Sequence, residues 1–381
     1  MNQKIRLFLK KSYLCLNDKT IKTRFFFDGE YARWEKFNAD RKTTASFIEK
    51  NAKEQKIFYL VPGVKISGGI AVVFQHANGL LQRGYDVKIL SLNNSNDGSW
   101  FPNQEVEILP YSQTQEILES DEADVLIATA YSTAFSVDMS KAKRKLYFVQ
   151  SDESRFFPED AELTKKIKKT YELPLEYVVA VSWLQEWLKK EFGQDAHCVP
   201  NGLDLNMFHK TEAIEPKANK IRILIEGGIN ISYKGMDDAY AVVKDLDCEL
   251  WIVSNNGKPR RDWKYDRFFE NVSLQDMPKI YSSCDILLKM SKVESFCYPP
   301  LEMMACGGVA VIRRVTGIEE YAVDGENCLI VEDIESAKKA IERLISDESL
   351  RNKLITTGLE TTKKWDWNNS IDLLEKSIIK H

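Results

Sequence analysis

Two glutamates separated by seven residues form the most chemically specific feature of the sequence. Glu294 and Glu302 flank residues 295–301, which contain two adjacent prolines. Proline fits the first turn of a helix because its missing N–H would be unpaired there in any case. The backbone amides of residues 295–297 would then face a ligand and favour an anion. Because carboxylates do not favour phosphates, we expect Glu294 and Glu302 to hold hydroxyls of a sugar or a ribose. The alternative is that Glu302 only caps a helix or forms an ion pair.

Phosphate-binding chemistry is indicated at two other places. Gly68 and Gly69 open an expected helix, and glycine lets a ligand approach the backbone closely at a helix N-terminus. Lys234 opens a second expected helix, where its ammonium group can neutralise phosphate charge. Each signal is weak alone, because tight turns also need glycine and most lysines are surface residues. Gly68 and Gly69 also lack the GxGxxG pattern of dinucleotide sites.

These residues follow short β-rich runs that alternate with helical patterns. The first series of expected strands is Ile57–Val61, Asp86–Leu90, Val125–Thr129, Leu146–Gln150, Tyr177–Ser182 and His197–Pro200. The second series is Ile221–Glu226, Leu250–Ser254, Ile286–Met290, Val309–Arg313 and Cys328–Val331. Such alternation predicts parallel sheets with right-handed crossovers. We therefore expect an α/β protein of two Rossmann-like, doubly wound domains that face each other across a ligand-binding cleft.

The change of pattern along the chain suggests where the domains begin and end. Residues 201–219 lack periodicity and are polar, which is typical of a linker. The expected units are a basic N-terminal extension (1–56), a first α/β domain (57–200), the linker (201–219) and a second α/β domain (220–365).

The composition is that of a globular protein without a membrane or zinc signature. Of 381 residues, 44% are apolar and 29% are charged, which fits a folded chain of two domains. No apolar run approaches the roughly 18 residues that span a bilayer, so we expect a cytoplasmic protein. The seven cysteines are scattered and form no CxxC pair, which favours reduced thiols and argues against a zinc site. The net charge of −4 gives no indication of a nucleic-acid partner.

The start of the chain differs from the rest in charge. Residues 1–25 carry seven basic side chains against one acidic side chain, interspersed with apolar residues. Such a segment could make peripheral contact with an anionic membrane surface. The alternative is a solvated helix packed on the body of the protein.

Taken together, the motifs resemble glycosyltransferase family 4, retaining enzymes with the GT-B fold. The resemblance covers about residues 57–345. The segments that carry it, besides the two glutamates, are Gly68-Gly69, Arg83–Val87, Pro200–Asp204 with Phe208, Met303–Gly308, Gly317, Glu320 and Asp324-Gly325. Residues 147–150, 232–236 and 295–300 look closest to bacterial surface-polysaccharide members, including rhamnosyltransferases that use dTDP-rhamnose. In this fold the last helix commonly crosses back, so residues 366–381 are expected to complete the first domain.

The resemblance implies a role for each candidate residue. Lys234 would bind the donor diphosphate, Glu294 would contact the transferred sugar near its anomeric centre, and Glu302 would hold the ribose. These roles make Glu294 and Lys234 the catalytic candidates. The remaining donor-side candidates are Gly68 and Gly69 against the diphosphate, Ser295, Phe296 and Cys297 through their amides, and Ser254, Val272 and Leu274 near the base. Gln150 is the candidate on the acceptor side.

Two residues depart from the family pattern, and several other signals look structural. Ile229 stands where many members have an arginine, and Gln150 stands where many have a histidine that Gln150 cannot replace as a base. Asp245-Leu246-Asp247 resembles a DxD metal motif but precedes a strand, at the wrong end of a sheet for the cleft. We therefore expect no metal and no resident cofactor, and interpret His76 and His197 as structural.

The expected function is retaining transfer of a sugar from a nucleotide-diphosphate donor to a carbohydrate or lipid-linked glycan acceptor. One alternative is a nucleotide-sugar epimerase or phosphorylase on the same fold. Nucleotide release that requires an acceptor would separate a transferase from an epimerase. A second alternative, favoured by the missing arginine and histidine, is a non-catalytic subunit that binds nucleotide sugars. The glutamate pair and Lys234 argue against it.

Overall fold

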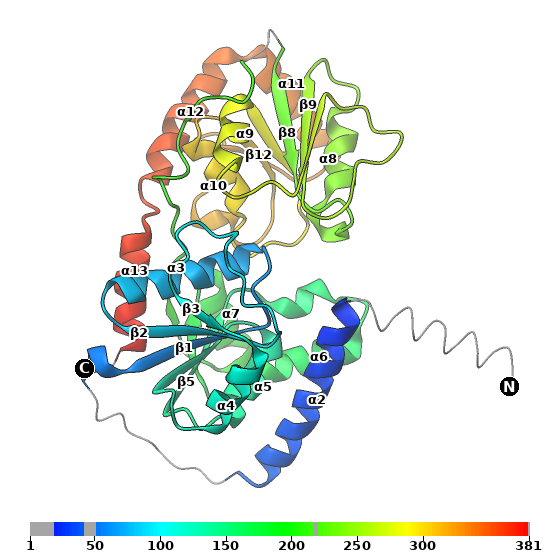
Figure 1. Cartoon of the computed structure of the whole chain (residues 1–381). Helices are drawn as coiled ribbons and strands as arrows, with labels where there is room; N and C mark the ends of the chain where they lie inside the picture. Colours follow the sequence, from blue (N-terminus) through cyan, green and yellow to red (C-terminus); the bar gives the residue numbers. More distant parts are fainter. Residues whose placement is uncertain (1–18, 42–50, 217–219, 380–381) are drawn as a thin grey trace, which may run out of the picture.

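The chain folds into two α/β domains stacked one above the other (Figure 1). The computed structural model describes residues 19–41, 51–216 and 220–379. Both sheets are entirely parallel, as the alternation of strands and helices predicts. Helices cover both faces of each sheet, so the strands are buried runs and the expected pair of doubly wound domains is confirmed.

The N-terminal domain is built on a seven-stranded sheet with the order β3-β2-β1-β4-β5-β6-β7. Its strands are β1 (Lys56–Val61), β2 (Asp86–Ser91), β3 (Glu107–Leu109), β4 (Val125–Ala128), β5 (Arg144–Val149), β6 (Glu176–Val179) and β7 (Ala196–Cys198). Its helices are α2 (Lys19–Ala39), η1 (Ala52–Glu54), α3 (Gly68–Gln82), α4 (Tyr111–Glu119), α5 (Tyr131–Met139), η2 (Glu153–Phe156), α6 (Ala161–Thr170) and α7 (Ser182–Phe192).

The C-terminal domain has a six-stranded sheet with the order β10-β9-β8-β11-β12-β13. Its strands are β8 (Arg222–Glu226), β9 (Glu249–Ser254), β10 (Arg267–Glu270), β11 (Ile286–Lys289), β12 (Val309–Arg313) and β13 (Leu329–Val331). Its helices are η3 (Ser232–Lys234), α8 (Met236–Val243), α9 (Met277–Ser283), α10 (Tyr298–Ala305), η4 (Ile318–Glu320), α11 (Ile334–Ser346) and α12 (Glu348–Thr362); the last helix of the chain is α13 (Trp367–Ile378).

The structure corrects the expected strands in two ways. Strands β3 and β10, at the edges of the two sheets, were not expected from the sequence. The expected strand Tyr177–Ser182 was too long, because Ser182 already begins α7. Residues 201–216 contain no helix or strand, but they are not simply solvated, since Leu203 and Phe208 are buried.

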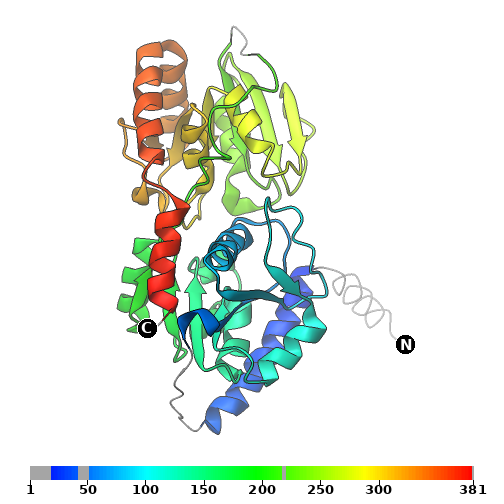
Figure 2. The same cartoon turned by 60° about the vertical axis from the view of Figure 1, so that its left-hand side comes forward.

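The chain passes between the domains twice, and the two passages lie against each other. The backbone N–H of Leu203, after the first passage, donates to the carbonyl of Trp365 at 2.8 Å. Helix α13 then runs along the N-terminal domain (Figure 2). It packs on α3 so closely that a Cβ at Gly79 would lie 2.7 Å from Ile371.

Helix α2 is fastened to the N-terminal domain rather than extending from it. Phe27 is buried against Phe135 of α5, and Trp34 Nε1 donates to Asp138 Oδ2 at 2.7 Å. Residues 1–18 of the basic segment lie outside the described residues, so membrane contact by residues 1–25 stays a prediction. Among the residues that the structure describes, no helix is long and apolar enough to cross a bilayer.

His76 is buried where α3 meets α13. This burial should make the stability of the protein depend on pH. Its ring lies 4.8 Å from that of Phe148, and neither ring nitrogen has a hydrogen-bond partner among the described residues. Burial lowers the pKa of His76 to about 3, so the folded protein holds this ring neutral. The unfolded chain takes up a proton near its ordinary pKa of about 6.5, so this contribution to stability is lost as the pH falls.

We expect the free energy of unfolding of the wild type to fall, relative to His76→Phe, by about 2 kcal/mol between pH 7 and pH 5. Urea titrations of both proteins at the two pH values measure this difference. The constant cost of repacking Phe cancels in the comparison. Burial raises the pKa of both Glu153 and Glu302 to about 7, which adds stability below pH 7 in both proteins and also cancels. If the difference in the free energy of unfolding between the two proteins did not change with pH, His76 would not be held neutral by burial.

Candidate active site

The side chains of Lys234 and Glu294 meet in the C-terminal domain, as part of the candidate site. Lys234 Nζ donates to Glu294 Oε1 at 2.8 Å, and both side chains are only partly exposed. Gly235 makes this approach possible: its φ is +64°, and a Cβ there would lie 1.9 Å from the carbonyl oxygen of Met290. The close packing of η3 against the end of β11 therefore requires glycine and fixes where Lys234 emerges.

A second lysine, Lys289, also acts electrostatically on Glu294. Lys289, at the end of β11, is almost fully buried, and its Nζ donates to Glu226 Oε2 at 2.6 Å and to the Glu226 carbonyl at 2.8 Å. Burial alone would raise the pKa of Glu294, but the positive charges of Lys234 and Lys289 outweigh it and hold that pKa below its usual range. Glu294 is therefore an anion stabilised by two lysine charges, and it can accept hydrogen bonds.

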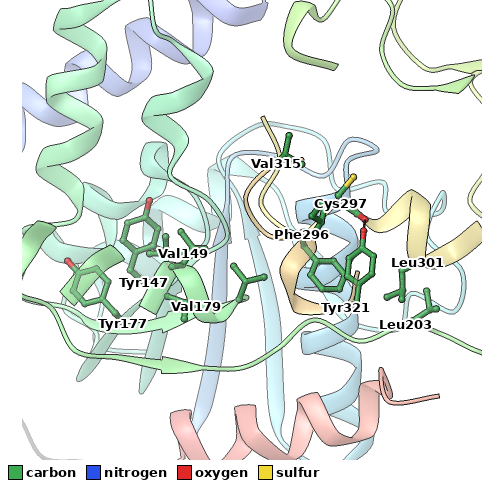
Figure 3. Close-up of a cluster of buried hydrophobic side chains, with 14 of the residues drawn as sticks. Tyr147, Val149, Tyr177, Val179, Leu203, Phe296, Cys297, Leu301, Val315 and Tyr321 are labelled. Carbon is green, nitrogen blue, oxygen red and sulfur yellow. Dashed lines mark hydrogen bonds between the residues drawn. The ribbon is translucent and has the colours of Figure 1, made fainter. Parts of the chain in front are cut away.

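The segment between the two glutamates is held in an unusual backbone conformation. Helix α10 begins at Tyr298, as the two prolines predict, and Cys297 before it has a φ of +65°. Tyr321 OH donates to the Cys297 carbonyl at 2.7 Å, and the ring of Phe296 packs beside that of Tyr321 (Figure 3). A non-glycine residue in this region is strained, and such strain persists only where surrounding contacts impose it. The buried Phe296 side chain thus anchors the loop whose amides are candidates for ligand contact.

Glu302 lies deeper than Glu294 and has a partner of its own. Its side chain is buried, and its Oε2 accepts a hydrogen bond from Tyr281 OH of α9 at 2.8 Å. Burial raises the pKa of Glu302 to about 7, with the Tyr281 hydrogen bond opposing the rise. The two glutamates therefore differ electrostatically, although their spacing suggests a matched pair.

Residues of the N-terminal domain reach the same loop. Ser151 and Ser295 share a hydrogen bond of 2.6 Å between their hydroxyl groups, and Trp183 Nε1 donates to the Ser295 carbonyl at 3.0 Å. Arg155 NH1 donates to the Glu294 carbonyl at 3.4 Å. The domains are therefore in direct contact at the loop that carries Glu294.

Gly69 and Gln150 come together at the start of α3. A Cβ at Gly69 would lie 3.2 Å from Gln150 Oε1, while Gln150 Nε2 donates to the Thr129 carbonyl at 3.3 Å. Ser67 caps α3 by accepting from the N–H of Ile70 at 3.3 Å. Gly68 has open space around it. The ends of β4 and β5 thus bring an amide side chain to the N-terminus of α3.

The residues expected near the nucleobase lie at or just after the carboxyl ends of β9 and β10 in the second sheet. Ser254 ends β9, is buried, and accepts a hydrogen bond from the N–H of Ile229 at 3.3 Å. Ile229 itself is buried in the core, so it offers a backbone group but no charge at the position where many members of the resembled family have an arginine. Val272 and Leu274 follow β10 and are partly buried.

Several site residues were not found from the sequence. Lys289 ends an apolar strand run. Its buried ion pair with Glu226 could not be predicted, because the two residues lie on different strands far apart in the sequence. Arg155, Ser151 and Trp183 come from the other domain, and no local motif marks them.

Asp247 of the DxD segment, which resembles a metal motif, pairs with Lys220. Within residues 19–41, 51–216 and 220–379, no group of three or more His, Cys, Asp or Glu side chains could hold a metal ion.

Two parallel-sheet α/β domains that approach each other in this way define the GT-B fold of glycosyltransferases. Solved structures bear this out at low sequence identity. Sucrose-phosphate synthase from Thermosynechococcus elongatus aligns with a TM-score of 0.73 at 15% identity and covers 85% of this chain and 98% of its own. Anabaena HepE in complex with UDP-glucose aligns with a TM-score of 0.70 at 13% identity over 85% of this chain and 99% of its own.

Sequence comparison points to the same class. Residues 266–361, which include both glutamates, match the family of glycosyl transferases group 1. An uncharacterized glycosyltransferase of Methanocaldococcus jannaschii is 26% identical over 191 residues, 45% of this chain and 54% of that protein. The Myxococcus xanthus O-antigen biosynthesis protein RfbC is 24% identical over 266 residues, 67% of this chain and 21% of that protein. The chain thus spans about half of the first relative and a fifth of the second.

Proposed function

We propose that this chain is a retaining, metal-independent glycosyltransferase. It would move a sugar from a nucleotide-diphosphate donor to a carbohydrate or lipid-linked glycan during synthesis of a surface polysaccharide. The observation that carries the proposal is the Lys234–Glu294 pair, held at a loop that both domains contact. The similarity to an O-antigen biosynthesis protein supports the acceptor class, and dTDP-rhamnose is the donor to test first.

Lys234 and Glu294 would divide the chemistry of the donor between them. The ammonium group of Lys234 has three N–H donors, and Glu294 accepts one of them, so the others can bind the diphosphate. This charge would stabilise the leaving group as it develops, which is the kind of interaction that lowers a barrier. Glu294, kept ionised by two lysines, would accept hydrogen bonds from sugar hydroxyls near the anomeric carbon.

The anomeric configuration would be retained because the diphosphate leaves from the same face of the sugar that the acceptor attacks. A leaving phosphate oxygen would take the acceptor's proton, since Gln150 cannot act as a base. Protein cations and backbone amides would stabilise the negative charge of the diphosphate, as a metal ion does in other transferases. The contacts between Ser151, Trp183 and the Ser295 segment would exclude water from the donor.

Arg155 is our candidate for the cation that Ile229 does not supply. Its guanidinium already reaches the Glu294 carbonyl from the other domain and lies 5.5 Å from the ring centre of Trp183. We expect Arg155→Gln to lower kcat/KM for the donor by about tenfold to a hundredfold, because a charge-assisted contact is worth roughly 1.5–3 kcal/mol. Arg155→Lys should recover part of the loss. Steady-state kinetics of the three proteins check this, and unchanged kinetics in Arg155→Gln would assign the diphosphate to Lys234 and backbone groups alone.

Acceptor-dependent release of nucleotide tests the proposed function. Purified protein is incubated with dTDP-rhamnose, UDP-glucose or GDP-mannose, with and without saccharide or lipid-linked acceptors, in the presence of a chelator. We expect free nucleotide diphosphate only when an acceptor is present. Isomerised donor without acceptor would indicate the epimerase alternative, and donor binding without any release would indicate the non-catalytic subunit.

A further inference from the structure

Residues 151–156 (the η2 segment) follow β5 and reach the C-terminal domain at several points. Besides their hydrogen bonds to the loop that carries Glu294, the ring of Phe156 stacks on that of Tyr233, with ring centres 5.3 Å apart and an interplanar angle of 27°. Tyr233 directly precedes Lys234 in η3. The position of this short segment therefore determines how the N-terminal domain meets both members of the proposed catalytic pair.

The side chain of Glu153 ties the η2 segment to the body of the N-terminal domain. Its Oε2 accepts hydrogen bonds from the backbone N–H of Tyr131 at 2.6 Å and from Tyr147 OH at 3.0 Å. Tyr131 begins α5, so this N–H is one that the helix cannot satisfy internally. The N–H of Glu153 donates to Tyr171 OH at 3.0 Å, and that hydroxyl donates to the Ser151 carbonyl at 3.3 Å. One carboxyl group and one hydroxyl group thus anchor the segment.

The carboxyl group of Glu153 works here as a hydrogen-bond acceptor rather than as half of an ion pair. The two groups that donate to it are neutral, and the nearby charge of Asp152 opposes its ionisation. Burial raises the pKa of Glu153 to about 7, because removal from water disfavours the charged form. Carboxyl groups with raised pKa values are concentrated at functional sites, and Glu153 lies two residues before Arg155, which contacts the Glu294 loop.

We propose that Glu153 is a positioning residue of the active site. It acts through the η2 segment, because its two hydrogen bonds hold that segment where it contacts the C-terminal domain. The inference rests on the proposed function, since it gives the segment a part in glycosyl transfer. The position of the segment can nevertheless be measured without any substrate.

Disulfide formation between the domains measures this position directly. The hydroxyl oxygens of Ser151 and Ser295 are 2.6 Å apart, so the two thiols of Ser151→Cys/Ser295→Cys should lie within bonding reach. In this background we expect Glu153→Ala to slow formation of the disulfide about tenfold. Glu153→Gln should leave the rate within about twofold, because the amide oxygen of Gln can still accept both hydrogen bonds. Peptide mapping distinguishes this disulfide from any that involves a native cysteine.

The matched control is Asp124→Ala in the same background. Asp124 is another buried carboxylate that accepts a backbone N–H, that of Lys56 at 3.0 Å, but it lies at the opposite end of the same sheet from the η2 segment. It also pairs with Lys143 at 2.8 Å, so its loss should cost at least as much stability. We expect it to change the rate of disulfide formation less than about twofold. Equal slowing by both alanine variants would overturn the proposal, since general destabilisation would then explain it.

Kinetics with the donor test whether the position matters for transfer. Glu153→Ala should lower kcat/KM about tenfold, and Glu153→Gln should recover most of it. Adding Arg155→Gln to Glu153→Ala should deepen the larger single loss less than about threefold, because both changes remove the same contact. If Glu153→Ala does not fold, Tyr171→Phe removes the other anchor and should give the same pattern in both assays.

Fully multiplicative losses in the double variant, or no recovery with Glu153→Gln, would overturn the proposal. Failure of the proposed function would look different. The wild type would then transfer no sugar, while the disulfide rates would still decide whether Glu153 positions the η2 segment.

Discussion

The Glu294→Gln variant should lose two to three orders of magnitude in glycosyl transfer while it keeps its fold. Gln has the same shape as Glu but no charge, so Lys234 loses its ion-pair partner and Lys289 loses a nearby negative charge. A neutral amide cannot match the positive charge that develops at the anomeric carbon as the diphosphate leaves. The expected loss is in kcat, because this interaction strengthens mainly in the transition state.

The matched control is Glu332→Gln, which removes a carboxylate paired with Arg314 at 2.6 Å on the surface of the same domain. We expect its kinetics to equal those of the wild type. Initial rates of nucleotide release at saturating acceptor, together with circular dichroism, measure both variants. Near-normal turnover in Glu294→Gln would remove Glu294 from the catalytic assignment.

The Lys234→Met variant should lose about a hundredfold to a thousandfold in kcat/KM for the donor. Methionine keeps the apolar stem but removes the ammonium group, so the diphosphate would lose the cation that we propose binds it. We also expect the free nucleotide diphosphate to bind more weakly, since the phosphates contribute to ground-state binding. Kinetics and nucleotide titrations separate these two effects.

Lys292→Met is the control for this variant. Lys292 lies two residues before Glu294 and pairs with Asp238 at 3.1 Å, but its side chain is half exposed. Its loss should change donor kinetics less than about threefold, in keeping with an exposed ion pair. If both lysine variants lost activity equally, general charge around the site would explain the effect rather than Lys234.

The architecture could be predicted from the sequence because buried parallel strands are continuous apolar runs. Strands β1, β4, β5, β8 and β12 are of this kind. The two edge strands could not be found in this way. Strand β3 has three residues, and β10 has only two apolar residues and no fully buried one. Their pairing depends on neighbours far away in the sequence rather than on their own pattern.

Only the site residues that belong to local sequence motifs could be predicted from the sequence. The seven-residue spacing places Glu294 before helix α10 and Glu302 about one turn inside it, and Lys234 ends the short helix η3, directly before Gly235. The spacing does not reveal that Glu302 pairs with Tyr281 inside the domain. Arg155 and Trp183 could not be predicted from the sequence, because their contacts with the Glu294 loop depend on how closely the two domains approach.

The proposed nucleotide-sugar site at Lys234 and Glu294 is tested most directly by a thermal-shift titration of wild type and Lys234→Met with dTDP-, UDP- and GDP-sugars and their free nucleotides, without metal. At about 100 times its dissociation constant, the correct ligand should add about 2.7 kcal/mol to the stability of the wild type. We expect the wild type to shift with the nucleotides of one base, and Lys234→Met to shift much less with the same ligands. Equal shifts in both proteins, or no shift with any nucleotide, would contradict a nucleotide-sugar site at Lys234 and Glu294.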